Sequence, residues 1–278
     1  MPFLHPYFGG WAMLPVEKKR IVVFSSGASK FTSLSTQKPT PLVSVDEALD
    51  LAGNAGGLDL DERDVQDILD SRPSWAELKA IAAQGGSGFY RLALDARPDG
   101  WLYPWAEISA VVSSRRDGSV NELAKQLGVE FVWFSAKGDW AEQYQIIVRH
   151  YRPHVMVLVG WLLRVVGLDW GNPPVINTHP GPLPETAGMY GIKLHEWVLA
   201  SGRSETAVTV HFVDDGLDTG QVILRYPIPL RDDETPRSLQ ERVKLHEHYI
   251  LSRVVGYVLY GGRSPIPPEK IRCPIFSA

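Results

Sequence analysis

The feature that most constrains the fold is a regular alternation of apolar runs and amphipathic segments in the middle of the chain. Short β-branched runs are typical of buried strands, whereas apolar residues spaced i, i+3, i+4 are typical of helices. The predicted strands are 108–112, 129–134 and 154–159, and the predicted helices between them are 119–128 and 139–152. Repeated strand–helix–strand units of this kind predict a parallel sheet with right-handed crossovers and a site at the carboxyl ends of its strands.

Local signals mark where the two helices begin and end. Ser119 with Glu122 has the spacing of a capping box, and Asp139 with Glu142 opens the second helix in the same way. Gly128 is a typical residue just beyond a helix C-terminus.

Further elements extend this pattern on both sides. Residues 21–24 predict an earlier strand, and 206–213 with 221–229 predict a hairpin that carries Asp218 at its turn. Thr235-Pro236 predicts the start of a long C-terminal helix. The predicted fold is a Rossmann-like α/β fold: an open, mostly parallel sheet with helices on both faces.

A polar site is predicted where the next apolar run stops, at Asn177 and His179. Side chains at i and i+2 of an extended strand point to the same side, so this amide and imidazole share a face. An amide can donate a hydrogen bond to an oxyanion, and an imidazole can donate a second one or carry a proton. A carboxylate such as Asp218 would favour the charged ring. On these residues alone, a structural role for the histidine stays open.

Linked motifs around these residues resemble the folate-dependent formyltransferases. The matching stretches, in chain order, are Asn177-Thr178-His179-Pro180, Leu183-Pro184, Gly188 and the run from Val208 to Gly220. Within that family the pattern is closest to the enzymes that formylate glycinamide ribonucleotide. The resemblance implies that Asn177, His179 and Asp218 are the catalytic residues.

The resemblance also implies two binding regions. The folate would lie against the loop after the 154–159 strand and against the hairpin turn, on Trp161, Leu162, Leu163, Arg164, Val165, Asp214 and Asp215. The amine substrate would contact Gly160, a glutamate on the last helix at Glu247, and a phosphate turn at Ser26, Gly27, Ala28 and Ser29. That turn lacks a glycine of the family pattern, so the same residues are also compatible with a plain strand-to-loop turn.

One long stretch departs from the family pattern. Residues 31–100 are expected to be a helical insertion after the first strand, with helical spacing at 61–69 and 75–83. The expected division is an N-terminal arm at 1–19, a catalytic domain at 20–262 and a C-terminal arm at 263–278.

Composition narrows the class of partner. The net charge of −4 gives no reason to expect nucleic acid or an anionic membrane. A single cysteine, Cys273, excludes an intramolecular disulfide and favours a reducing cytoplasm. No segment reads as a signal peptide or membrane span. The expected partners are a small-molecule amine and a folate, and the oligomeric state is open between monomer and homodimer.

The function expected from the resemblance is transfer of a formyl group from 10-formyltetrahydrofolate, used as co-substrate without a metal, to a primary amine. The favoured acceptor is glycinamide ribonucleotide, in de novo purine biosynthesis. A different amine such as an amino sugar nucleotide is the main competing acceptor, because the altered turn and Lys244 both lie on the acceptor side. A formyltetrahydrofolate deformylase and a metal-dependent hydrolase are less favoured functions.

Overall fold

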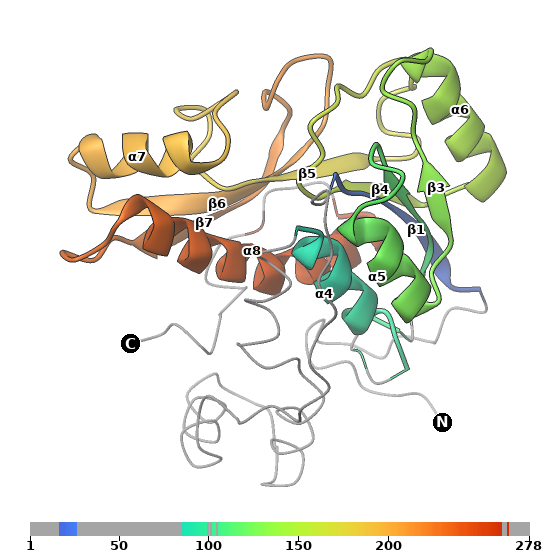
Figure 1. Ribbon diagram of the computed structural model, residues 1–278, viewed down its shortest axis with the longest axis horizontal. Helices are drawn as coiled ribbons and strands as arrows, with labels where there is room; N and C mark the ends of the chain where they lie inside the picture. The colour runs from blue at the N-terminus through green and yellow to red at the C-terminus, as the bar shows by residue number, and fades with distance from the viewer. Residues whose placement is uncertain are drawn as a thin grey trace, which may run out of the picture.

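A computed structural model describes residues 17–26, 85–98, 100, 102–103, 105–262 and 266. The strands form one sheet in the order β3-β2-β1-β4-β5-β6-β7 (Figure 1). Their bounds are β1 Lys19–Phe24, β2 Ala106–Ser113, β3 Phe131–Trp133, β4 Val155–Leu158, β5 Val175–His179, β6 Glu205–Phe212 and β7 Val222–Pro229. Neighbours from β3 to β5 pair in parallel, whereas β6 pairs antiparallel to β5 and to β7. The mostly parallel sheet and its terminal hairpin are confirmed.

Helices lie on both faces of the sheet, as predicted. Their bounds are α4 Ser87–Asp95, α5 Ser119–Leu127, α6 Trp140–Tyr151, α7 Ile192–Ala200 and α8 Pro236–Leu259. In Figure 1, α6 lies on the opposite side of the sheet from α4 and α5, and α8 runs beneath the centre of the sheet.

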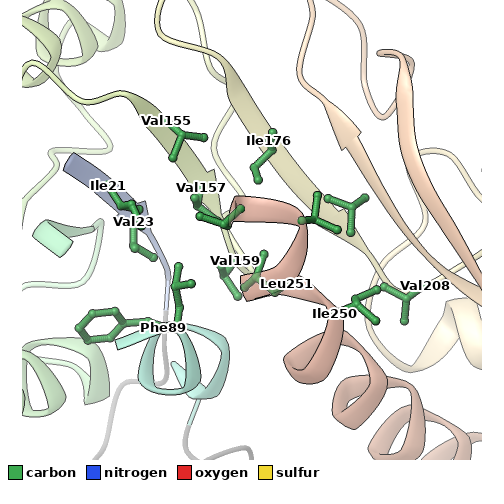
Figure 2. Close-up of a cluster of buried hydrophobic side chains, with 14 of the residues drawn as sticks. Ile21, Val23, Phe89, Val155, Val157, Val159, Ile176, Val208, Ile250 and Leu251 are labelled. Carbon is green, nitrogen blue, oxygen red and sulfur yellow. The ribbon is translucent and has the colours of Figure 1, made fainter. Parts of the chain in front are cut away.

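The side chains of β1 point alternately to the two faces of the sheet and so contribute to two separate cores. Ile21 and Val23 face a core shared with α4, α5, α7 and α8, whereas Val22 and Phe24 face a second core shared with α6. Figure 2 shows the first core, where Phe89 of α4 lies below β1 and α8 passes under β4 and β5. A strand that is apolar on both faces is buried on both faces, so β1 lies in the middle of the sheet.

The helix ends agree with the sequence signals except at one point. Asp139 accepts a hydrogen bond from the main-chain N–H of Glu142 at 3.0 Å, and Thr235 forms a capping box with Ser238. Gly128 ends α5 in the left-handed conformation. The capping box expected from Ser119 and Glu122 is wrong, because Gly118 is the N-cap and Ser119 is already helical and buried.

Helix α4 is an element that the sequence patterns do not predict. It falls inside the stretch expected to be an insertion, yet Phe89 and Leu92 are fully buried in the main core. The helices predicted at 61–69 and 75–83 lie outside the described residues, and the domain boundaries stay a prediction.

Candidate active site

The site is built on the end of β5. Asn177 and His179 point to one face of this strand, and Thr178 between them points to the other. Antiparallel pairing sets Asn177 opposite His211 of β6. Facing pairs in an antiparallel ladder have neighbouring side chains, so the register brings a second imidazole to the amide.

The turn between β6 and β7 supplies the carboxylate. Asp218 has a positive φ of 57°, a conformation that a non-glycine residue adopts at some cost. Asp214 folds the turn by accepting hydrogen bonds from the Gly216 N–H at 3.0 Å and the Thr219 hydroxyl at 2.7 Å. A side chain at Gly216 would collide with Thr219, so the turn needs glycine there.

Asp218 is the centre of the cluster. Its Oδ2 lies 3.4 Å from His179 Nδ1 and accepts the main-chain N–H of Gly188 at 3.0 Å. Its Oδ1 lies 3.5 Å from His211 Nε2 and 3.3 Å from the amide nitrogen of Asn177, which donates to it. The three residues expected to be catalytic therefore lie together, from segments separated by up to 41 positions.

Hydrogen bonds fix the ring of His179. The Thr186 hydroxyl donates to the carbonyl of Pro182 at 2.9 Å, so its oxygen accepts from His179 Nε2 at 2.9 Å. With the proton on Nε2, the lone pair of Nδ1 faces the carboxylate of Asp218. A proton placed between these two atoms would be held by both.

The titration of the pair follows from its surroundings. Burial lowers the pKa of His179, Asp218 raises it and His211 lowers it, with a net lowering from 6.5. Burial raises the pKa of Asp218, but the contact with His211, the hydrogen bond from the Gly188 N–H and the neighbouring imidazole of His179 together outweigh burial and lower it from 3.8. At neutral pH the pair is a carboxylate beside a neutral ring.

His211 is the residue of this cluster to which the sequence patterns assign no role. Its Nδ1 lies 2.8 Å from the carbonyl oxygen of Phe212 and donates to it, which leaves Nε2 facing both Asp218 and Asn177. The hairpin prediction did not pair 206–213 with β5, so the register that sets His211 opposite Asn177 is known only from the structure.

Two arginines from other segments hold the loop after β5 in place. Arg225 of β7 donates to the carbonyl of Leu183 at 3.0 Å and to Glu185 at 3.2 Å, and Arg203 also donates to Glu185. This loop carries Thr186 and Gly188, so the arginines support contacts to both His179 and Asp218.

The predicted folate residues divide into two groups. Trp161 and Val165 are buried, and the Trp161 indole donates to the hydroxyl of Tyr144 at 2.8 Å, so these side chains anchor the loop. Leu162 is 68% exposed, and Arg164 donates to the main-chain oxygen of Asp215. The 160–165 loop and the Asp218 turn are thus neighbours, and only part of the predicted set faces solvent.

The predicted phosphate turn is described only at Ser26, since Gly27, Ala28 and Ser29 lie outside the described residues. Ser26 N–H donates to the carbonyl of Gly160 at 3.4 Å, and its buried hydroxyl has no partner among the described residues.

A second glycine-rich turn reaches the same edge of the sheet. Gly85-Gly86-Ser87-Gly88 leads into α4, and a side chain at Gly88 would collide with Val159 just after β4. The first N–H groups of a helix have no intrahelical partners, so this turn presents donors at the strand ends. The run of glycines itself, at Gly85, Gly86 and Gly88, was the sequence signal.

Glu247 lies on the opposite face of β5 from the catalytic cluster. The hydroxyl of Thr178 donates to its carboxyl group. Burial raises the pKa of Glu247, and the Thr178 hydrogen bond and Lys244 oppose that effect only in part. The neighbouring His248 is buried, and its Nε2 lies 2.9 Å from the hydroxyl of Ser87, which joins α8 to the first turn of α4.

Two structural features are absent from the described part of the chain. Among these residues, no group of three or more His, Cys, Asp or Glu side chains could hold a metal ion. Within the same ranges, no helix has the length and apolarity needed to cross a membrane.

Comparison with known proteins identifies the family. The model of the family described as "Formyl transferase" matches residues 80–255, which is more than half of the chain. The chain belongs to the formyl transferase family. The match starts shortly before α4 and leaves β1 outside, so the helix that reaches the strand ends is part of the family pattern.

Two relatives with the same name illustrate the similarity. The chain is 29% identical over 189 residues to the chloroplastic phosphoribosylglycinamide formyltransferase of Arabidopsis thaliana, covering 64% of each chain. It is 28% identical over 200 residues to the phosphoribosylglycinamide formyltransferase of Mycobacterium tuberculosis, covering 69% of this chain and 89% of the relative. The chain therefore spans somewhat less than two thirds of the plant relative.

Solved structures show the same fold. A phosphoribosylglycinamide formyltransferase from Streptococcus pneumoniae matches with a TM-score of 0.56 at 24% identity, over 86% of this chain and 98% of that one. Another from Anaplasma phagocytophilum matches with a TM-score of 0.58 at 18% identity, over 88% of each.

Proposed function

We propose that this protein transfers a formyl group from 10-formyltetrahydrofolate to the primary amine of glycinamide ribonucleotide, as a step of purine biosynthesis. The observation that carries the proposal is the position of Asp218 between Asn177 and His179 at the end of β5. The names of the relatives support the acceptor.

The cluster suits this chemistry. Formyl transfer forms one carbon–nitrogen bond and breaks another, develops negative charge on the carbonyl oxygen, and moves a proton from the attacking amine to the departing nitrogen. The Asn177 amide makes two long contacts of 3.3 Å, so an N–H can be exchanged onto a developing oxyanion. We assign the oxyanion contact to Asn177.

The proton is assigned to the pair of Asp218 and His179. Both ring nitrogens of His179 face protein oxygens, with Nε2 on Thr186 and Nδ1 on Asp218. A proton released by the amine would be held between Asp218 Oδ2 and His179 Nδ1 until the leaving nitrogen takes it. No metal ion takes part in this route.

The folate would supply the formyl carbon and lie between the two neighbouring loops. The exposed side chain of Leu162 and the main chain from Gly160 to Val165 are available to its apolar rings, together with the turn at Asp214 and Asp215. Trp161 and Val165 support this loop from the core.

The acceptor would lie toward α8 and α4. We assign its phosphate to the strand ends beside Ser26, with the first turn of α4 at Ser87 and Gly88 as the main donors, and the unpartnered Ser26 hydroxyl supports this assignment. Glu247 is assigned to the hydroxyl groups of the ribose. Gly27, Ala28 and Ser29 stay candidates for the same phosphate site.

The wider setting follows from the same reasoning. A single cysteine and a net charge of −4 favour the cytoplasm and small-molecule partners over nucleic acid or membrane. The catalytic domain is proposed to span 20–262, and either a monomer or a homodimer is compatible with it.

The test is formylation of glycinamide ribonucleotide by the purified protein, followed through the absorbance of the folate product. Asp218→Asn and His179→Ala are expected to lower kcat by about 10²- to 10⁴-fold, the usual range for removal of an acid–base group. Glu205→Gln, at an exposed position at the opposite end of β6 from His211, is the matched control. If the protein formylated an amino sugar nucleotide and not glycinamide ribonucleotide, the assigned acceptor would be wrong. If it bound no folate, the assignment as a formyltransferase would be refuted.

A further inference from the structure

The turn that carries Asp218 is held at two points. On its inner side, Asp218 itself contacts the cluster. On its outer side, Asp215 accepts two hydrogen bonds from one neighbouring segment: Arg164 donates to its main-chain oxygen, and the Trp170 indole donates to its Oδ1 at 3.0 Å.

The segment that provides these donors is fixed to the body of the protein. Its Trp161 indole is buried and bonded to Tyr144 of α6. A side chain at Gly167 would lie 2.4 Å from Cβ of Ala141, so the main chain there packs directly on α6. Gln145 donates to the carbonyl of Gly167 at 3.0 Å. The segment that carries the donors to Asp215 is therefore held against α6.

The turn has few other supports between Asp215 and Asp218. Residues 215–217 are exposed, and the carboxylate of Asp214 is used within the turn itself. In the part of the chain that the structure describes, Asp215 is the residue among 214–217 that accepts hydrogen bonds from outside the turn. Asp218 follows three positions later, in a left-handed conformation that needs external support.

We propose that Trp170 is a positioning residue for Asp218, acting through its hydrogen bond to Asp215. The bond fastens the turn to the 160–170 segment and so keeps the carboxylate within reach of Asn177 and His179. The inference rests on the proposed function for its effect on rate, but the fastening of the turn stands on geometry alone.

The experiment compares Trp170→Phe, which keeps an aromatic ring and removes the indole N–H, with Trp140→Phe. Trp140 is a fitting control because its indole N–H also makes a surface hydrogen bond, to the carbonyl of Ala136, away from the turn. Hydrogen–deuterium exchange of a peptide covering 213–220 is expected to rise several-fold in Trp170→Phe and to stay unchanged in Trp140→Phe.

Kinetics then separate positioning from simple loss of folded protein. Trp170→Phe is expected to lower kcat about tenfold with little change in the KM of the amine, as displacement of a catalytic group does. The negative charge of Asp218 raises the pKa of His179. If Asp218 moves away from the ring, the pKa of His179 falls, and the acidic limb of the pH–rate profile moves to lower pH. His211 on β6 and His195 on α7, the other titratable groups near this ring, are unchanged in the variant.

A second variant keeps the inference testable if Trp170→Phe fails to fold. Asp215→Ala removes the acceptor of the same bond and is expected to raise the exchange of 213–220 on its own. Where Trp170→Phe folds, the double variant is expected to be no worse than Asp215→Ala alone, because one bond cannot be lost twice. The inference would be overturned if residues 213–220 of Trp170→Phe exchanged at the same rate as in the wild type. A tenfold loss of rate without a shift of the acidic limb of the pH–rate profile would also overturn it. A wild-type protein with no transferase activity refutes the proposed function, and the exchange measurement still decides the fastening.

Discussion

Asp218 and Glu247 approach the end of β5 from opposite faces, and their pKa values move in opposite directions. Burial raises the pKa of both. For Asp218, the contacts with His211, the Gly188 N–H and His179 reverse the effect, and the carboxyl group ionises more readily than usual. For Glu247, the Thr178 hydroxyl and Lys244 do not reverse it.

The comparison shows that the balance between burial and neighbouring polar groups decides the direction in which each pKa moves at this strand end. The face with the ionised carboxylate also holds two imidazoles and an amide, as proton transfer requires. The face with Glu247 offers a group suited to hydrogen bonding with a neutral polar partner. One strand thus separates a reactive region from a binding region by the alternation of its side chains.

Removal of the side chain on the binding face is expected to have the largest effect on stability. Glu247→Ala should cost about 2 to 3 kcal/mol of unfolding free energy, because it leaves a cavity and removes the acceptor of the Thr178 hydroxyl. Glu247→Gln keeps the size and an acceptor and should stay within about 1 kcal/mol of the wild type. Urea denaturation measures both, and equal losses in the two variants would contradict the assignment.

On the reactive face, Thr186→Val tests whether the ring of His179 must be held. Thr186 is fully buried, and valine fills its volume without accepting from Nε2. We expect kcat/KM to fall about tenfold, equivalent to about 1.4 kcal/mol, since the ring loses the contact that sets its tautomer. Thr186→Ser keeps the hydroxyl and is the control. A valine variant as active as the serine variant would show that the contact is dispensable.

The smallest of these effects should be the change of unfolding free energy with pH, which tests the contrast between Asp218 and Glu247 most directly. The lowered pKa of Asp218 stabilises the fold above its unfolded value near 3.8, and this stabilisation is lost as pH falls. The raised pKa of Glu247 stabilises the fold below its unfolded value near 4.5, and this stabilisation is lost as pH rises.

Relative to Asp218→Asn, the wild type should therefore lose stability toward low pH. Relative to Glu247→Gln, it should lose stability toward high pH. Denaturation of the three proteins between about pH 2 and 8, a range that includes the unfolded pKa values of both groups, measures the two slopes. Slopes of the same sign would refute the comparison.

The sequence alone determined the elements whose signals are local. Periodicity of apolar residues located the central strands, Thr235-Pro236 located the start of α8, and the spacing of Asn177 and His179 put both on one face of β5. These features depend on residues within one or two turns of each other, so a single segment contains the necessary information.

Tertiary structure decided what depends on pairing between distant segments. The register of β6 against β5 brought His211 to Asn177, and the loop after β5 brought Thr186 to His179. Burial against β4 made α4 part of the core, although it falls within the stretch expected to be an insertion. The bond between Trp170 and Asp215 joins residues 45 positions apart. No local pattern encodes such contacts, because only the packed sheet brings these residues within hydrogen-bonding distance.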